Sequence, residues 1–374
     1  MSEYQYYEFQ TADRPLTEEE QEAVGALSSH IEVTPTQAIV TYSYGNFKHD
    51  PKEVLTDYFD AMIYLANWGS RELMFRFPKG LIALEQVRPY CLEDFITLET
   101  MGDHIVLDIQ LDEEEGVDWL EGEGVLSSLL RLRGDILQGD YRVLYLAWLK
   151  AITLDDPEVV TADLEPPVPA GLQNLNSALG HFAQVFEIDS YLIEAATASS
   201  PELQERSQDA LRQAIVRLPR EICDDFLVRL AQGEPLLSVA LNRELRTSIG
   251  SSPVQAMPRR TVAQLFGEAE RLRTRARQRQ AQEAEKGRIH GLQILAQNEA
   301  RTWQEVEALI GKSQAKAYDE AVELLLKLQE LAVFQGTQAA FQAQMAQLCD
   351  RYKSRRSLLE RFRGAGLSMK DGTA

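Results

Sequence analysis

The chain has 374 residues, a formal net charge of −20 at pH 7 and 44% hydrophobic residues. This length predicts more than one domain, and the apolar fraction is too high for a disordered chain. No apolar run approaches the roughly 18 residues that a membrane span needs, and the polar N-terminus lacks signal-peptide features. The three cysteines are sparse and lack metal-ligand spacing. These features favour a cytoplasmic protein without a membrane partner.

The charge is divided unevenly along the chain. Residues 1–165 are strongly acidic, residues 166–258 are mildly acidic, and residues 259–374 carry more basic than acidic side chains. Because an acidic surface repels phosphates, this charge argues against nucleic-acid binding by the first part. Nucleic acid stays open as a partner for residues 259–301.

Residues 1–165 are expected to form an acidic α+β domain with a mostly antiparallel sheet, because the connections between strands are short. Thr17 and Glu20 form a capping box at a helix start, and Asp50 precedes a proline at another. A helical stretch at 125–152 is expected to break near Gly134 or Gly139. The expected strands, rich in aromatic and β-branched residues, lie at 3–9, 37–44, 61–66 and 72–77, with a hairpin at 94–111.

The rest of the chain has a helical pattern. A proline-rich linker at 164–172 precedes a small helical bundle at 170–248, and a second linker precedes a long basic helix at 259–300. Thr261 and Gln264 cap that helix, its first apolar positions have coiled-coil spacing, and Gly287 and Gly291 predict a bend or break. Residues 301–367 form a tail of helical hairpins with a spacing similar to tetratricopeptide repeats, for which Thr302 is the expected first cap.

The stretch "YFDAMIYLANWGSRELMFRFPKG" (58–80) is the first candidate site. Asn67, Trp68 and Arg71 lie at a turn and are candidate ligand-binding residues. The alternative is a buried core, in which Asn67 and Gly69 serve the backbone of the turn.

The stretch "RLRTRARQRQ" (271–280) is the second candidate site. An acidic protein surface or nucleic acid would bind such a basic helix. Two alternatives are a merely solvated helix and a helix docked on the acidic half of the same chain. The candidate partner-binding residues here are Arg271, Arg273, Arg275, Arg277 and Arg279.

Recognisable catalytic and metal motifs are absent from the sequence. The acidic run at 112–124 does not follow the calcium-loop pattern, and the five histidines lack a second ligand at metal spacing. There is no phosphate-binding loop, nucleophile elbow or zinc-protease motif. We therefore expect no cofactor and no metal, name no catalytic residue, and favour a non-enzymatic protein.

Two stretches resemble known families. "EYQYYEFQ", "DRPLTEEE", "GNFKHDP" and "YFDAMIYLANWG" are similar to a widespread family of uncharacterised bacterial proteins, and the similarity extends to the ending "SLLERFRGAGL". This resemblance implies a bacterial protein but no activity.

The second resemblance covers roughly residues 300–365. "AYDEAVELLLKLQELA" and "AFQAQMAQLCDRYKSRRSLLERF" resemble the helical tail of bacterial SWIM zinc-finger proteins. The Cys-x-Cys and Cys-x-His pairs of the finger do not occur, so the resemblance carries over no zinc site. It implies an interaction module, with Tyr318, Arg355 and Arg356 as candidate contacts.

The leading hypothesis is a non-enzymatic bacterial adaptor or scaffold that binds another protein through its basic helix and helical tail. One alternative is a small-ligand-binding protein or enzyme that uses the N-terminal domain. The other is a nucleic-acid-associated accessory protein.

Overall fold

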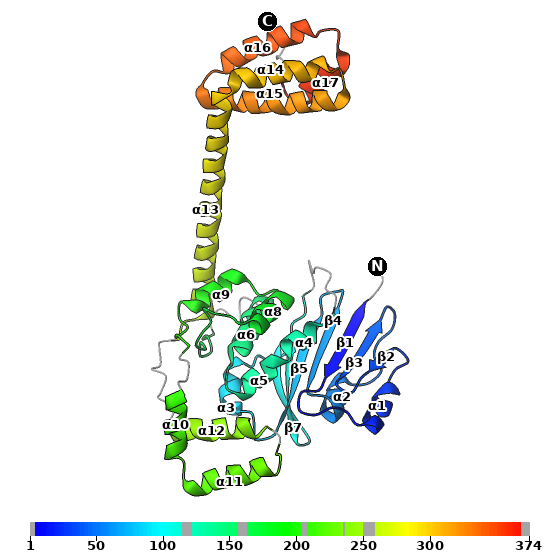
Figure 1. Cartoon of the computed structure of the whole chain (residues 1–374), viewed down its shortest axis with the longest axis vertical. Helices are drawn as coiled ribbons and strands as arrows, with labels where there is room; N and C mark the ends of the chain where they lie inside the picture. Colours follow the sequence, from blue (N-terminus) through cyan, green and yellow to red (C-terminus); the bar gives the residue numbers. More distant parts are fainter. Residues whose placement is uncertain are drawn as a thin grey trace. The chain divides into compact units, whose positions relative to one another are not determined.

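The computed structural model describes residues 4–113, 122–155, 163–203, 208–234, 236–249 and 259–367 (Figure 1). The chain divides into two compact units, Met1–Arg273 and Thr274–Ala374. The acidic run and the second linker of the sequence analysis lie largely outside the described residues.

The first unit is built on a seven-stranded sheet with the order β2-β3-β1-β4-β5-β7-β6, and every neighbouring pair is antiparallel. The α+β prediction is therefore confirmed, and each expected strand is present. The additional strand β2 is too short for its pattern to be recognised. The strands are β1 (Gln5–Gln10), β2 (Ile31–Val33), β3 (Gln37–Tyr42), β4 (Ala61–Ala66), β5 (Arg71–Pro78), β6 (Ile96–Met101) and β7 (His104–Gln110).

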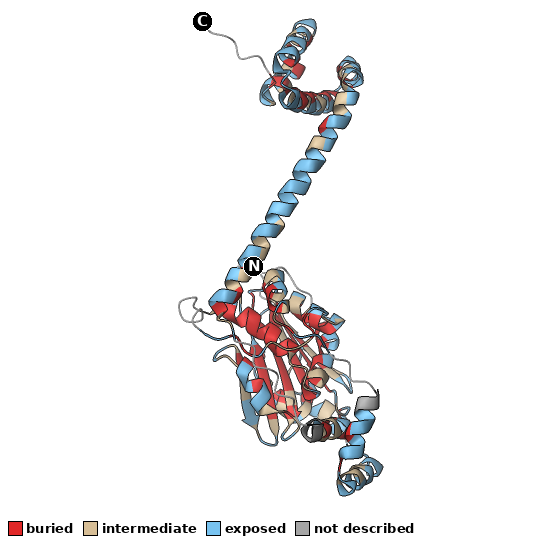
Figure 2. Ribbon diagram, turned by 90° about the vertical axis from the view of Figure 1, so that its left-hand side faces the viewer, coloured by how far each residue is buried: buried red, intermediate tan, exposed pale blue. Residues whose placement is uncertain are grey.

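Both faces of the sheet are covered, as the nearly continuous burial of β1 and β4 indicates (Figure 2). Alternate residues point to opposite faces of a strand, so Phe75 and Leu107 face one core while Met74 and Val106 face the other. The second core is closed by two short helices. Both start as predicted, with a complete capping box at Thr17 for the first and an Asp50 cap for the second. They are α1 (Glu18–Gly25) and α2 (Pro51–Tyr58).

The other face carries the larger core, which unites the sheet with most of the following helices. The predicted interruption falls around Gly139, which has a positive φ of 74°, whereas Gly134 lies inside α5. The buried α6 packs at the centre of this core. The helices are α3 (Leu84–Val87), the 3₁₀ turn η1 (Arg88–Tyr90), α4 (Val125–Leu129), α5 (Arg131–Leu137), α6 (Arg142–Leu154), α8 (Ser177–Val185) and α9 (Ser190–Thr197).

Three further helices have little core of their own. Their buried cluster consists of Ala214, Leu218 and Leu245, and α11 buries no residue. Val239 of α12 belongs to the main core instead. The helices are α10 (Gln208–Arg217), α11 (Arg220–Ala231) and α12 (Leu237–Ile249).

The long helix α13 spans Val262–Gln297 and begins with the predicted capping box. It continues without interruption through Gly287 and Gly291, contrary to the expected break. A glycine weakens a helix by about 1 kcal/mol relative to alanine, which a helix of this length tolerates. The coiled-coil spacing at its start serves the protein's own core, because Val262, Leu265 and Ala269 are buried there.

The second unit contains the rest of α13 and four helices that share one core. Leu325 and Leu328 of α15 and Phe341 and Met345 of α16 are among the residues buried in it. The expected cap at Thr302 is wrong, because α14 begins three residues earlier and Thr302 is buried inside it. The helices are α14 (Glu299–Gly311), α15 (Ala315–Gln335), α16 (Gln338–Arg351) and α17 (Arg356–Gly364).

A buried ion network fixes the loop after β1 to the start of β4. The Arg133 guanidinium donates to both oxygens of Asp13 at 2.8 and 2.7 Å, and Arg76 donates to Asp60 Oδ1 at 2.8 Å. Asp60 Oδ2 accepts from the backbone amides of Ala12 and Asp13 at 2.7 and 2.9 Å. Burial opposes ionisation, but Arg133 and these amides hold the pKa of Asp60 below its usual value.

We predict that Arg133→Met lowers the free energy of unfolding of the first unit by about 3–5 kcal/mol, because it leaves a carboxylate without its partner in the interior. The matched control is Arg131→Met on the same helix, where the arginine is 68% exposed. That change should cost less than about 1 kcal/mol. Urea denaturation followed by tryptophan fluorescence measures both, and equal losses would contradict the structural role of the network.

Candidate functional site

The turn with the first candidate residues serves structural roles. Asn67 Oδ1 accepts a hydrogen bond from the Tyr4 amide at 3.0 Å and thereby holds the start of β1 beside the turn. Trp68 is 45% exposed, and its indole N–H donates to Ser70 Oγ at 3.0 Å. Gly69 has a φ of 106°, which explains the glycine at this position.

Arg71 is 4% exposed and points into the protein. Its guanidinium donates to Glu187 Oε1 at 2.5 Å, and so joins β5 to the turn between α8 and α9. Lys150 from α6 lies beside this pair and binds Glu113 Oε2 at 2.9 Å. The charges of Arg71 and Lys150 are therefore compensated internally.

The arginine run lies on α13, which is exposed along most of its length (Figure 2). Arg271, Arg275, Arg277 and Arg279 are exposed, and within the described parts of the chain none of them has a hydrogen bond or an ion pair. At 100° per residue, Arg271, Arg275 and Arg279 lie within about 80° of the helix circumference. These three residues are called the arginine stripe below.

Arg273 differs from its neighbours because it points to the opposite side of α13. Its guanidinium donates to Asp189 at the start of α9 and to Glu270, and it lies 5.6 Å from the centre of the Tyr191 ring. The hydrogen bond to Glu270 and the charge of Asp189 raise the pKa of Arg273. Arg273 therefore anchors the helix, which leaves the arginine stripe on the other side.

The base of α13 is fixed by a second buried network. Glu165 is 2% exposed and receives two hydrogen bonds from Arg260, at 2.6 and 2.9 Å. The Tyr145 hydroxyl donates to the same carboxylate, and Arg259 donates to the Glu165 carbonyl oxygen at 2.7 Å. Burial and the neighbouring Glu165 raise the pKa of Tyr145, so it stays protonated. The first turn of α13 is therefore held by side chains from two distant segments.

The candidate residues of the tail differ in their accessibility. Tyr318 is buried, and its hydroxyl receives a hydrogen bond from Arg355 at 3.2 Å. Arg355 also donates to the Ile310 carbonyl oxygen at the end of α14 and lies over the Tyr352 ring. These contacts hold the tail together, whereas Arg356 is exposed.

A carboxyl pair on the sheet was not found from the sequence. Lys52 of α2 binds Asp108 Oδ2 at 2.8 Å, while the other oxygen of Asp108 is buried, and a protonated Glu72 carboxyl donates a hydrogen bond to Asp108. Burial and the neighbouring Asp108 raise the pKa of Glu72 to about 8. Cross-strand register brings these carboxyls together from two strands, a proximity that sequence spacing does not reveal.

A serine–histidine contact joins α4 and α8. Ser128 Oγ contacts His181 Nδ1 and lies 2.7 Å from the Val125 carbonyl oxygen, which is also a hydrogen-bond acceptor for the hydroxyl. The tautomer of His181 decides which of the two groups donates in their contact.

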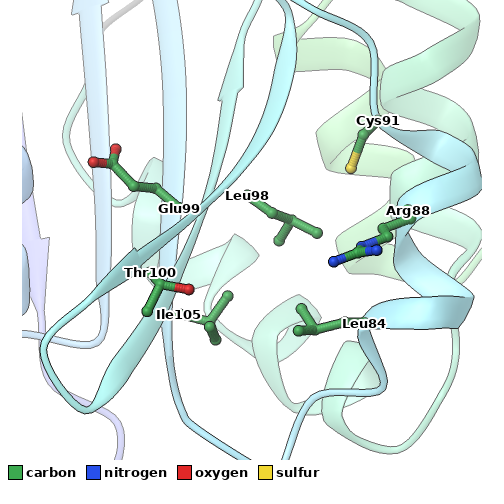
Figure 3. Close-up of a pocket in the computed structure, with 7 residues that line it drawn as sticks. All are labelled: Leu84, Arg88, Cys91, Leu98, Glu99, Thr100 and Ile105. Atoms are coloured by element: carbon green, nitrogen blue, oxygen red, sulfur yellow. The ribbon is translucent and has the colours of Figure 1, made fainter.

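A cavity of about 270 Å³ lies between β6 and the α3–η1 segment (Figure 3). The side chains of Leu98, Thr100 and Ile105 point into it from the sheet, while Glu99 points to the other face. Asn67, Trp68 and Arg71 do not line it. The cavity is lined by Leu84, Arg88, Cys91, Leu98, Glu99, Thr100 and Ile105.

The chain matches no protein-family model, no curated protein and no solved structure in the comparisons with known proteins. Within the described parts, no helix is long and apolar enough to span a membrane, and no group of three or more potential ligands is placed to hold a metal ion.

We predict that Glu72 makes stability depend on pH. In the folded protein its carboxyl keeps a proton up to about pH 8, whereas in the unfolded chain it releases the proton near the ordinary value of 4.5. Its contribution to the free energy of unfolding is therefore complete below pH 4.5 and is lost as the pH rises through about 8. Glu72→Gln, which is permanently neutral, should show a smaller fall in melting temperature over this range.

The matched control is Glu32→Gln, an exposed change in the same sheet. Its melting temperature should follow that of the unsubstituted protein across the pH series. A Glu72→Gln curve that also runs parallel to the unsubstituted protein would show that Glu72 does not titrate in this range.

Proposed function

We propose that this protein is a non-enzymatic bacterial adaptor in the cytoplasm, which binds an acidic surface of another protein through the arginine stripe of α13 and the adjoining tail. The observation that carries the proposal is the contrast along one helix. Arg273 is bound by Asp189 and Glu270, whereas the arginine stripe is exposed and has no acidic partner among the described residues.

The sequence around the stripe strengthens this interpretation. No acidic residue lies between Glu270 and Glu283, so the arginines are not neutralised by neighbours on the same helix. Exposed arginine side chains form charge-assisted, often bidentate hydrogen bonds with carboxylates. The carboxylates of an acidic partner would therefore pair with the arginines of the stripe.

One observation favours a protein partner over nucleic acid. The tail exposes Leu326, Val333 and Phe334 on α15. Large exposed apolar side chains contribute to protein–protein interfaces, whereas interfaces with nucleic acid are more polar.

The internal use of the other charged groups supports a binding role rather than catalysis. Arg71 and Arg133 are paired with carboxylates within the fold. The cavity of the first unit is smaller than the roughly 300–1,000 Å³ of ordinary ligand pockets.

The test is affinity purification with the tagged full chain from nuclease-treated extract of the organism that encodes it. We predict one dominant protein partner, which binds about tenfold more weakly when Arg271, Arg275 and Arg279 are all replaced by glutamine. Three exposed charge pairs at about 0.2–1 kcal/mol each account for a loss of this size.

The matched control replaces Lys48, Lys79 and Arg131 by glutamine, which removes the same charge from exposed positions outside both the stripe and the tail. This variant should retain the partner. Equal loss in both variants would mean that total charge, and not the stripe, determines binding. A partner that is recovered only from extract without nuclease treatment would show that the chain binds nucleic acid and not a protein surface.

A further inference from the structure

The second edge of the sheet has a feature that the proposed function does not use. β6 is the last strand beside β7 and has no strand on its outer side. The opposite edge strand, β2, has three residues, whereas β6 has six and contains no proline or lysine. Natural proteins protect edge strands by shortening them or by adding such residues. β6 has neither protection; its one charged residue is Glu99, and its first residue pairs with Leu92.

The hydrogen bonds of β6 show which backbone groups face outward. At the start of the strand, Ile96 exchanges two hydrogen bonds with Leu92 on the outer side, at 2.9 and 3.1 Å. Outward and inward positions alternate in an antiparallel pair, so Leu98 and Thr100 also direct their N–H and C=O groups outward. Within the described residues no hydrogen bond reaches these groups.

The cavity opens beside these outward groups. Leu98 and Thr100 line it together with Leu84 from the helix side (Figure 3). Arg88 is also part of the lining, and its side chain is 66% exposed with one ion pair, 3.8 Å from an exposed Glu85. An exposed pair of this length contributes little and leaves Arg88 available to another carboxylate.

We infer that β6 and the cavity bind an extended peptide segment of another protein, which adds to the sheet as a further strand. The outward groups of Leu98 and Thr100 bind its backbone, and one aliphatic side chain enters the cavity. An acidic residue of the same segment binds Arg88. This is β-strand addition, in which the backbone supplies affinity and a side-chain pocket supplies specificity.

The test selects short random peptides displayed on phage against the immobilised full chain. The enriched peptides should share an aliphatic residue and an acidic residue in an alternating pattern. The best peptide is then measured by fluorescence anisotropy against the unsubstituted protein and against Thr100→Pro. Proline removes the outward N–H and keeps the pairing with β7, so binding should weaken about tenfold.

Two controls separate the edge from general damage. Thr100→Val keeps the backbone donor and should bind as the unsubstituted protein does, whereas Arg88→Gln should weaken peptides that contain the acidic residue. In the unsubstituted protein, the bound peptide should slow amide hydrogen exchange in residues 96–101 and leave β2 unchanged. This last measurement does not depend on the folding of any variant.

Three results would overturn the inference. One is a selection that enriches no common pattern, and another is a peptide that binds Thr100→Pro as tightly as Thr100→Val. The third is a dimer in solution that Thr100→Pro dissociates, because a second copy of the chain would then occupy the edge.

Discussion

The buried ion pair between Glu165 and Arg260 is the contact on which the arrangement of the basic helix depends. The pair joins the segment after the sheet to the residue just before the capping box of α13, and Tyr145 from the centre of the core completes it. Removing either charge would leave the other buried and unpaired, which is costly in a protein interior. Arg273, 13 residues after Arg260, anchors the helix a second time by binding Asp189. These two arginines anchor the start of the helix, and at 100° per residue the arginine stripe lies on the opposite side of α13 from Arg273.

Local signals made much of this fold predictable from the sequence. The capping box at Thr17 and the Asp50 cap depend on residues only a few positions apart, and the strands had clear aromatic and β-branched runs. The cap assigned to Thr302 failed because the same pattern also occurs inside a helix, where packing and not the pattern decides the first turn. Gly287 and Gly291 were expected to break α13, but the intrinsic cost of a glycine is too small to do so.

The candidate sites were less predictable, because their character depends on contacts between distant segments. The sequence could not distinguish Arg71 and Arg273, which are paired in the fold, from the exposed arginines. Their partners are Glu187 and Asp189, which lie 116 and 84 residues away along the chain. The outward backbone groups of β6 could not be predicted from the sequence either, because they follow from strand order and register. What the sequence does reveal directly is the charge pattern, and that pattern underlies the proposed adaptor role.

The most direct test of the central claim is arginine-selective chemical modification of the intact protein, followed by mass spectrometry of each site. The account predicts that Arg271, Arg275 and Arg279 react quickly, while Arg260 and Arg273 are protected by their carboxylate partners. Uniformly slow reaction of the arginine stripe, equal to that of Arg260, would show that the stripe is already covered by the protein itself. It would then be unavailable to a partner, and the adaptor proposal would fail at its first step.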